Sequence, residues 1–107
     1  MFTHLRPIDT EKQLLGTLLV SSGTKLVLVE DVLKINSFSI QYHQELYNWI
    51  QSRSSEGKPA DITSLLDSKG VQGSKKYGGV LYVSSLGDNT IVLDSTLREY
   101  ANRIVES

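Results

Sequence analysis

Apolar residues recur every three or four positions along most of the chain, which is the spacing of one face of an α-helix. The first such stripe predicts a helix that begins at Asp9 or Thr10, because either residue is a suitable N-cap. Glu11 then lies in the first turn, where the helix dipole favours a negative charge. Gly16 interrupts the stripe, and we interpret it as a point of close helix packing. The stripe consists of Leu14, Leu15, Leu18 and Leu19.

The next apolar segment, residues 26–33, has features of both a strand and a helix. Its valines favour a strand, because β-branched side chains fit an extended backbone well. A strand needs a partner, however, and the other candidate in the chain is residues 90–93. Helical spacing continues through the acidic pair Glu30-Asp31, so we predict a helix whose acidic pair faces solvent. The residues at this spacing are Leu26, Val29, Val32 and Leu33.

Two helices are predicted in the middle of the chain. Phe38 is expected to be a buried aromatic anchor in a turn, and Ser39 to cap a long helix over residues 40–54. A polar loop with Pro59 follows, and Asp61 is expected to cap the next helix. The apolar positions of the two helices are Tyr42, Leu46, Trp49 and Ile50, with Arg53 beside them, and then Ile62, Leu65 and Leu66.

Glycines mark the last third of the chain. Residues 70–76 are predicted to form a polar loop, and the pair Gly78-Gly79 to open a short apolar helix that ends at Gly87. A glycine pair at a helix start indicates close backbone approach or an unusual dihedral angle. A final helix is predicted from Asp94 or Ser95, and it carries Leu97, Tyr100, Ala101, Ile104 and Val105. The pattern therefore predicts an all-α bundle of about six short helices over residues 10–107, preceded by an arm of residues 1–9.

Composition restricts the possible functions of this bundle. The chain has 107 residues, enough for one domain, and 39% of them are hydrophobic. The net charge of −1 argues against tight autonomous binding of DNA, which normally needs a basic excess. Lys75-Lys76 is the best local basic patch, and such a pair is usually a solvated loop. The lack of cysteine excludes disulfides and thiolate metal sites, and no apolar run is long enough to span a bilayer.

We find no pattern typical of catalysis. His4 lies in the arm, and we interpret His43 as a structural or half-exposed residue, since no nucleophile motif accompanies it. Two histidines without carboxylates at ligand spacing make a weak metal site. The glycines before Lys75-Lys76 do not have the spacing of a phosphate-binding loop. The aromatic residues of the long helix could stack on bases but are more typical of a core: Tyr42, Tyr47 and Trp49.

Five motifs together resemble the N-terminal domain of DnaB-type replicative DNA helicases. No one motif is specific, but all five occur in the family's order and at fitting distances over nearly the whole chain. They are the opening segment 7–19 with its leucine–Gly16 step, Phe38 with His43 and Leu46-Tyr47, the loop from Gly57 through Pro59 to Asp61 and Leu65, the glycine-pair helix 77–86 with Gly78 and Gly79, and the last helix from Tyr100 to Glu106.

The resemblance implies a non-catalytic collar on a hexameric helicase ring. In this family the domain pairs with neighbouring subunits and helps to recruit primase and the helicase loader, so the implied setting is the cytoplasmic replication fork. The family's motor is an ATP-dependent 5′-to-3′ DNA helicase. Its ATP and magnesium sites have no counterpart here, so no cofactor is expected in this chain. Strong direct binding of nucleic acid and contact with a membrane are not expected either.

Three interpretations follow from these observations. The leading one is a helicase collar whose gene continues beyond Ser107 into an ATPase, and which associates weakly by itself because the family's helical hairpin is missing. The second is a stand-alone mimic of the collar that binds a host helicase. The third is a small helical DNA-binding protein, which the net charge disfavours.

Overall fold

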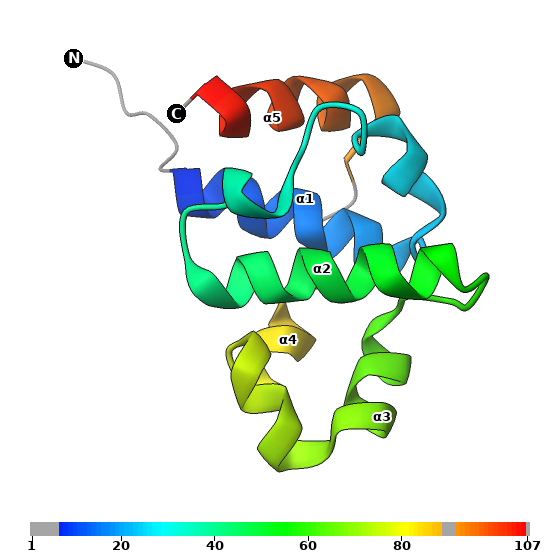
Figure 1. Ribbon diagram of the computed structural model, residues 1–107. Coiled ribbons are helices and arrows are strands. Elements are labelled where there is room, and N and C mark those ends of the chain that lie inside the picture. Colours follow the sequence, from blue (N-terminus) through cyan, green and yellow to red (C-terminus); the bar gives the residue numbers. More distant parts are fainter. Residues whose placement is uncertain (1–6, 89–91, 107) are drawn as a thin grey trace.

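The computed structural model describes residues 7–88 and 92–106, and these form a helical fold (Figure 1). No β-strand occurs within these ranges, which confirms the all-α prediction, although the α-helices number five and not six. The α-helices are α1 (Pro7–Val20), α2 (Gln41–Ser55), α3 (Ile62–Ser74), α4 (Val80–Ser85) and α5 (Asp94–Glu106). Short 3-10 helices connect them: η1 (Thr24–Leu28), η2 (Ile35–Ser37) and η3 (Lys75–Tyr77).

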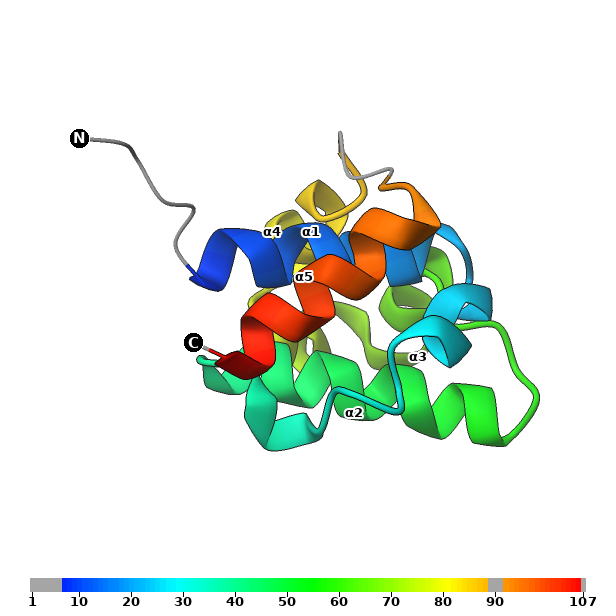
Figure 2. The same ribbon diagram turned by 90° about the horizontal axis from the view of Figure 1, so that it is seen from above.

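Helix α1 occupies the centre of the molecule. It packs against α5 on one side and α2 on the other, and α5 crosses over it when the molecule is viewed from above (Figure 2). Helices α3 and α4 lie beyond α2, and η3 packs against α2 (Figure 1). The first and the last helix are therefore neighbours, although most of the chain separates them in sequence.

The predicted stripe of α1 is buried, but the start of the helix was predicted too late. All four leucines of the stripe are at most 1% exposed, and Gly16 is buried between them. The helix begins at Pro7, so Asp9 and Thr10 lie inside it and do not precede it as caps. Proline is favoured at a first helical position because its missing N–H needs no partner there. The rest of the predicted arm, residues 1–6, lies outside the described residues.

The segment after α1 is not the predicted α-helix. Of the predicted stripe, Leu26, Val29 and Leu33 are buried and Val32 is half-buried, but the backbone forms the short helix η1 followed by turns. In a 3-10 helix, positions three residues apart face the same side, so Leu26 and Val29 can both face the core without a full α-helix. The prediction of an α-helix was wrong because an α-helix and a 3-10 helix show the same spacing of apolar residues over one turn.

Helix α2 begins at Gln41, one residue later than predicted, and Ser39 is not its cap. The N-cap position is Ile40, which has no side-chain hydrogen bond to offer. The chain is instead fixed by Gln44, whose side-chain amide donates to the Phe38 carbonyl (2.8 Å). The backbone N–H of Ser39 donates to a carboxylate from α1. Tertiary contacts therefore replace the local cap that the sequence indicated.

The loop predicted over residues 70–76 is mostly helical. Helix α3 bends at Gly70, where φ is 69° and ψ is −174°, and then continues to Ser74 and into η3. Only glycine adopts such a backbone angle readily, so the regular helix is interrupted at Gly70 and a second helical stretch follows it. Beyond the kink, Ser74 and Tyr77 are buried and hold the continuation against the rest of the fold.

The last two helices are close to the prediction. Helix α4 follows the glycine pair, and α5 begins at Asp94 and buries Leu97, Ala101 and Ile104. Of the expected stripe of α5, Tyr100 is half-buried and Val105 is 48% exposed. The predicted turn at residues 88–90 and the alternative strand partner at residues 90–93 lie partly outside the described residues.

Candidate functional site

A carboxylate from α1 lies in the middle of the fold. Glu11 precedes Leu14 and Leu15 by three and four positions, so it shares their helix face and points inward with them. Its side chain is completely buried. A buried carboxylate is costly unless other groups pair with it, so its partners determine what the site can do.

The partners of Glu11 come from α2 and from the turn before it. Oε1 lies 2.7 Å from Nδ1 of His43, which is also completely buried. Oε2 accepts a hydrogen bond from the backbone N–H of Ser39 (2.9 Å). The second ring nitrogen of His43, Nε2, lies 2.5 Å from the hydroxyl of Tyr82 on α4. A continuous chain of hydrogen bonds therefore links α1, α2 and α4, and we call Glu11, His43 and Tyr82 the buried polar junction.

The order carboxylate, imidazole, hydroxyl is also the order of a nucleophilic catalytic triad. An ionised carboxylate only accepts hydrogen bonds, so with Glu11 ionised the proton of this contact lies on Nδ1 of His43, and Nε2 faces the phenol. Burial raises the pKa of Tyr82, as do the neighbouring Tyr42 and the negative charges of Glu11 and Asp9. Tyr82 therefore stays protonated and is a poor nucleophile. Glu11 and His43 are closed to solvent and Tyr82 is partly buried, so the junction holds helices together and its carboxylate and imidazole do not reach the surface.

Aromatic rings surround the buried polar junction. The Tyr82 ring stacks on His43, with centroids 5.9 Å apart, and meets Tyr42 edge-on at 5.0 Å. Phe38 is 2% exposed and packs against Tyr47 at 4.9 Å. Burial raises the pKa of Tyr47 to about 12, with a smaller contribution from the charge of Glu30. Phe38 and Tyr47 belong to the core, and Tyr42 and Tyr82 pack at its edge, which supports the structural interpretation over base stacking.

The glycine pair gives this arrangement its shape. Gly78 and Gly79 have φ values of 104° and 98°, a region that other residues rarely adopt, as the unusual-dihedral interpretation predicted. A Cβ atom on Gly78 would lie 2.5 Å from the Tyr82 ring and 3.2 Å from the Tyr42 ring. A Cβ atom on Gly79 would meet nothing within 4 Å. Close approach and backbone conformation therefore both explain Gly78, whereas backbone conformation alone explains Gly79.

The loop that enters α3 is fixed at the opposite end of α2. Oδ1 of Asp61 accepts a hydrogen bond from the Ser64 backbone N–H at 2.7 Å, which confirms the predicted cap. This bond lowers the pKa of Asp61. The carbonyl of Pro59 accepts from Nε of Arg53 (2.9 Å), and the N–H of Ala60 donates to the carbonyl of Ser22 (3.0 Å). The loop thus joins α2 to the turn after α1.

An open hollow lies beside this loop. It is lined by Ser22, Gly23, Thr24, Ser54, Gly57, Lys58 and Pro59. The charged residue among these is Lys58, whose Nζ lies 3.4 Å from Oε1 of Glu56. The lining brings three hydroxyl groups and one exposed lysine together but contains no carboxylate or imidazole that could activate a hydroxyl.

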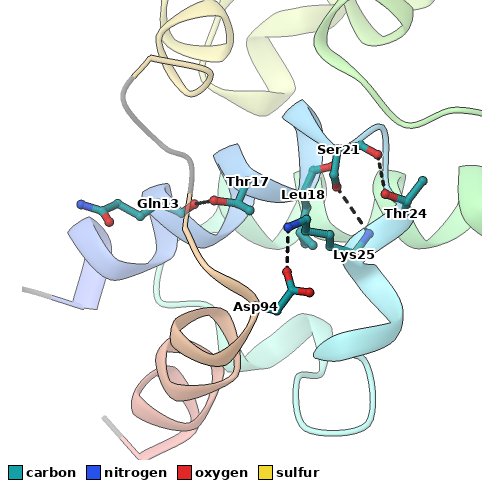
Figure 3. Close-up of polar contacts among 7 residues, drawn as sticks. All are labelled: Gln13, Thr17, Leu18, Ser21, Thr24, Lys25 and Asp94. Carbon is teal, nitrogen blue, oxygen red and sulfur yellow. Dashed lines mark hydrogen bonds and ion pairs between the residues drawn. The ribbon is translucent and has the colours of Figure 1, made fainter.

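A second polar junction joins η1 and the turn after it to α5, and it is exposed. Nζ of Lys25 lies 2.7 Å from Oδ1 of Asp94, close to the hydroxyl contacts that close the end of α1 (Figure 3). Arg98 donates to the Leu28 carbonyl at 2.7 Å and to Asp31 at 3.0 Å. The hydrogen bond from Arg98 lowers the pKa of Asp31. We call these two ion pairs the exposed polar junction.

The structure brings some of the predicted signature residues together and separates others. Phe38, His43 and Gly78 gather around the buried polar junction, with Gly79 adjacent in the chain. Pro59 and Asp61 lie at the other end of α2, and Gly16 lies inside α1. Tyr100 stands apart on α5, where the Arg103 guanidinium lies over its ring at 5.4 Å. His4 lies outside the described residues, and Lys75 and Lys76 are exposed on η3 as predicted.

Sequence reasoning missed two members of the buried polar junction. It assigned Glu11 to the helix dipole and treated Tyr82 only as part of an apolar helix. One signal was available for Glu11, since a carboxylate on the apolar face of a helix must find a partner. No local signal identifies that partner, because His43 is 32 positions away and Tyr82 a further 39.

Within residues 7–88 and 92–106, no cluster of three or more histidine, aspartate or glutamate side chains is arranged to hold a metal ion. Among the helices of these ranges, none combines the length and the apolar character needed to cross a bilayer.

Comparison with known proteins agrees with this arrangement. The family model described as "DnaB-like helicase N terminal domain" matches residues 3–106. The chain belongs to this family. No curated protein sequence matches significantly. The crystal structure of the N-terminal domain of DnaB helicase from Mycobacterium tuberculosis is similar, with a TM-score of 0.75 and 26% identity. The match covers 92% of this chain and 70% of that one.

Membership of the DnaB-like N-terminal domain family accounts for the absence of a catalytic pattern. The family match concerns the non-catalytic, N-terminal part of a DnaB-type helicase. The buried polar junction is accordingly a structural element of a DnaB-like N-terminal domain.

Proposed function

We propose that this chain is the collar domain of a replicative DNA helicase, which assists ring assembly and contacts primase and the helicase loader. The observation that carries the proposal is the family match over residues 3–106, combined with the burial of both Glu11 and His43, the carboxylate and the imidazole of the triad-like junction. A domain without accessible catalytic groups acts through its surfaces. Its place of action is then the replication fork in the cytoplasm.

The partners in this proposal are proteins. Neighbouring helicase subunits are the first, through the full-length helicase, and primase and loader are the others. No cofactor takes part in this domain, because ATP and magnesium belong to the motor of the parent helicase. The net charge of −1 is consistent with weak or no direct binding of DNA, and of the exposed pair Lys75-Lys76 the second lysine already pairs with Glu45, with Nζ 3.5 Å from Oε1.

The gene itself provides the first test. We expect the reading frame to continue beyond the Ser107 codon into an ATPase with a phosphate-binding loop. A stop codon at that point would contradict the collar assignment and favour the stand-alone mimic. The collar domain and the stand-alone mimic should also bind other helicases differently. A mimic should capture a heterologous helicase hexamer in a pull-down, and a collar domain should not.

A second test concerns assembly. Sedimentation of the isolated chain should show weak association at most, because the ring contacts of the collar depend on the rest of the helicase. A stable hexamer of this chain alone would contradict that expectation. Binding of the cognate primase and loader to the full-length helicase, with and without this domain, then tests the proposed partners directly.

A further inference from the structure

Helix α4 is attached to the rest of the fold in an unusual way. Its backbone packs mainly against α3 and η3 (Figure 1). In contrast, α1 packs directly against both α2 and α5, and η1 contacts all three of these helices. Helix α4 has six residues, too few to be stable without tertiary contacts. Side chains that reach from α4 to the α1–α2 pair therefore determine whether it stays in place.

Tyr82 is the side chain that makes this connection. Its hydroxyl lies 2.5 Å from Nε2 of His43, and its ring contacts Tyr42 and His43 of α2. The ammonium group of Lys12 on α1 lies over the same ring, 5.7 Å from its centroid. One residue of α4 thus contacts both helices of the central pair. Because Glu11 fixes the other side of His43, the ring that receives Tyr82 is held in position.

Glycines lie on both sides of α4. Gly78 and Gly79, with positive φ, precede it, and Gly87 follows it. Glycine has the greatest backbone freedom of any residue, so these positions can absorb a rotation of the segment between them. Val83 and Leu86 are buried, and their burial makes opening a rare event and not simple fraying.

We propose that the buried polar junction is a latch, and that residues 78–87 open as one unit when the hydrogen bond between Tyr82 and His43 breaks. The closed state is the one described here. The open state uncovers the side of α2 that carries Tyr42 and His43, while α1, α2 and α5 remain folded. This inference concerns the domain itself and holds whether or not the chain acts as a helicase collar.

Native-state hydrogen exchange tests the latch. In the unmodified chain, the amides of Val83 and Leu86 should exchange faster than those of Leu18 and Leu19 in α1. Their exchange should also depend less on added denaturant, because local opening exposes less surface than global unfolding. Equal rates and equal denaturant dependence in the two helices would overturn the proposal without any variant.

A pair of matched variants tests the role of the hydroxyl. Tyr82→Phe should speed exchange at Val83 and Leu86 about tenfold, the factor that corresponds to about 1.4 kcal/mol. Tyr77→Phe removes a phenol from the adjacent η3, and among the described contacts the Tyr77 hydroxyl makes no hydrogen bond. It should change these rates about twofold at most. Equal acceleration by both variants would overturn the latch.

A control in α5 separates local opening from general loss of stability. Ile104→Val removes one methylene from a buried position remote in sequence from α4. Because α5 is folded in both the closed and the open state, this substitution destabilises the two states equally. It should therefore speed amide exchange in α1, which requires global unfolding. The exchange rates of Val83 and Leu86 should stay unchanged if these amides exchange by local opening. If Ile104→Val accelerates Val83 and Leu86 as much as α1, these amides exchange by global unfolding and the proposal fails.

Discussion

The two polar junctions of this domain use similar groups in opposite environments. The buried polar junction joins α1, α2 and α4 through Glu11 and His43, which have no exposed surface. The exposed polar junction joins η1 to α5 through Lys25 and Asp94, whose side chains are 35% and 62% exposed. The distance between the paired atoms is 2.7 Å in both. Distance alone therefore does not say how much either contact contributes.

Solvent exposure determines how much each junction contributes to the stability of the fold. Water already solvates the exposed pair, and salt screens it, so its formation changes the free energy little. A buried charged group that loses its partner has no water to replace it, so the loss is large. The buried junction thus constrains which packing is possible, whereas the exposed junction adjusts a packing set by apolar contacts. Four substitutions test this comparison.

The largest effect is expected at Glu11. Glu11→Ala leaves the Ser39 N–H and Nδ1 of His43 without an acceptor, and should lower the free energy of unfolding by about 3–5 kcal/mol in urea denaturation. Replacing both partners by apolar residues, as in Glu11→Leu with His43→Leu, should restore part of this loss, because no polar group is then left unpaired. A loss below about 1 kcal/mol for Glu11→Ala would place the buried junction on a level with the exposed one.

The next effect is expected at Gly78. Gly78→Ala imposes an unfavourable φ and a contact of 2.5 Å with the Tyr82 ring, so it should lower the free energy of unfolding by about 2–3 kcal/mol. Gly57→Ala is the matched control, because Gly57 also has positive φ but open space around it. It should cost only about 1 kcal/mol. Equal losses in thermal or urea unfolding would mean that the rings simply move aside.

Asp61 should have an intermediate effect that depends on pH. Asp61→Ala removes the cap of α3 and should cost about 1 kcal/mol at neutral pH. The pKa of Asp61 is lowered in the folded state, so the stabilisation is present above the usual aspartate pKa and is lost as pH falls through the folded-state value. The difference between the two proteins should therefore shrink in acid.

Asp61→Asn is the control for this titration, since asparagine also caps helices but does not ionise. Its stability relative to Asp61→Ala should be independent of pH. An unchanged melting midpoint for Asp61→Ala at neutral pH would contradict the role of Asp61 as the cap of α3.

The smallest effect is expected at Lys25. Lys25→Met keeps most of the side-chain length but removes the ion pair with Asp94, and should cost at most about 0.5 kcal/mol at low salt. The difference should disappear at high ionic strength. A loss above about 1 kcal/mol that persists in salt would show that the exposed junction is as important as the buried one.

Features set by neighbouring residues could be predicted from the sequence. The leucine stripe of α1, the Asp61 cap and the unusual backbone of Gly78 and Gly79 depend on spacing or on the special properties of one residue type. The buried aromatic anchor Phe38 was also predicted, because a large apolar residue in a polar turn needs a place in the core.

Features set by distant contacts could not be predicted. Ser39 was expected to cap α2 but interacts with Glu11, which is 28 positions away. The segment after Gly70 was expected to be a loop, but the burial of Ser74 and Tyr77 holds it in helical form. The partners of Glu11 are also distant in sequence. For this reason the candidate site was harder to predict than the helices that carry it.

The pairing of α1 with α5 has a consequence for the synthesis of this protein. The ribosome adds roughly 5–20 residues per second, so α5 follows α1 by on the order of ten seconds. During that interval α2 can cover one side of α1, but the side that α5 covers stays open. The apolar face of the nascent helix is then available to chaperones until residues 94–106 have left the exit tunnel.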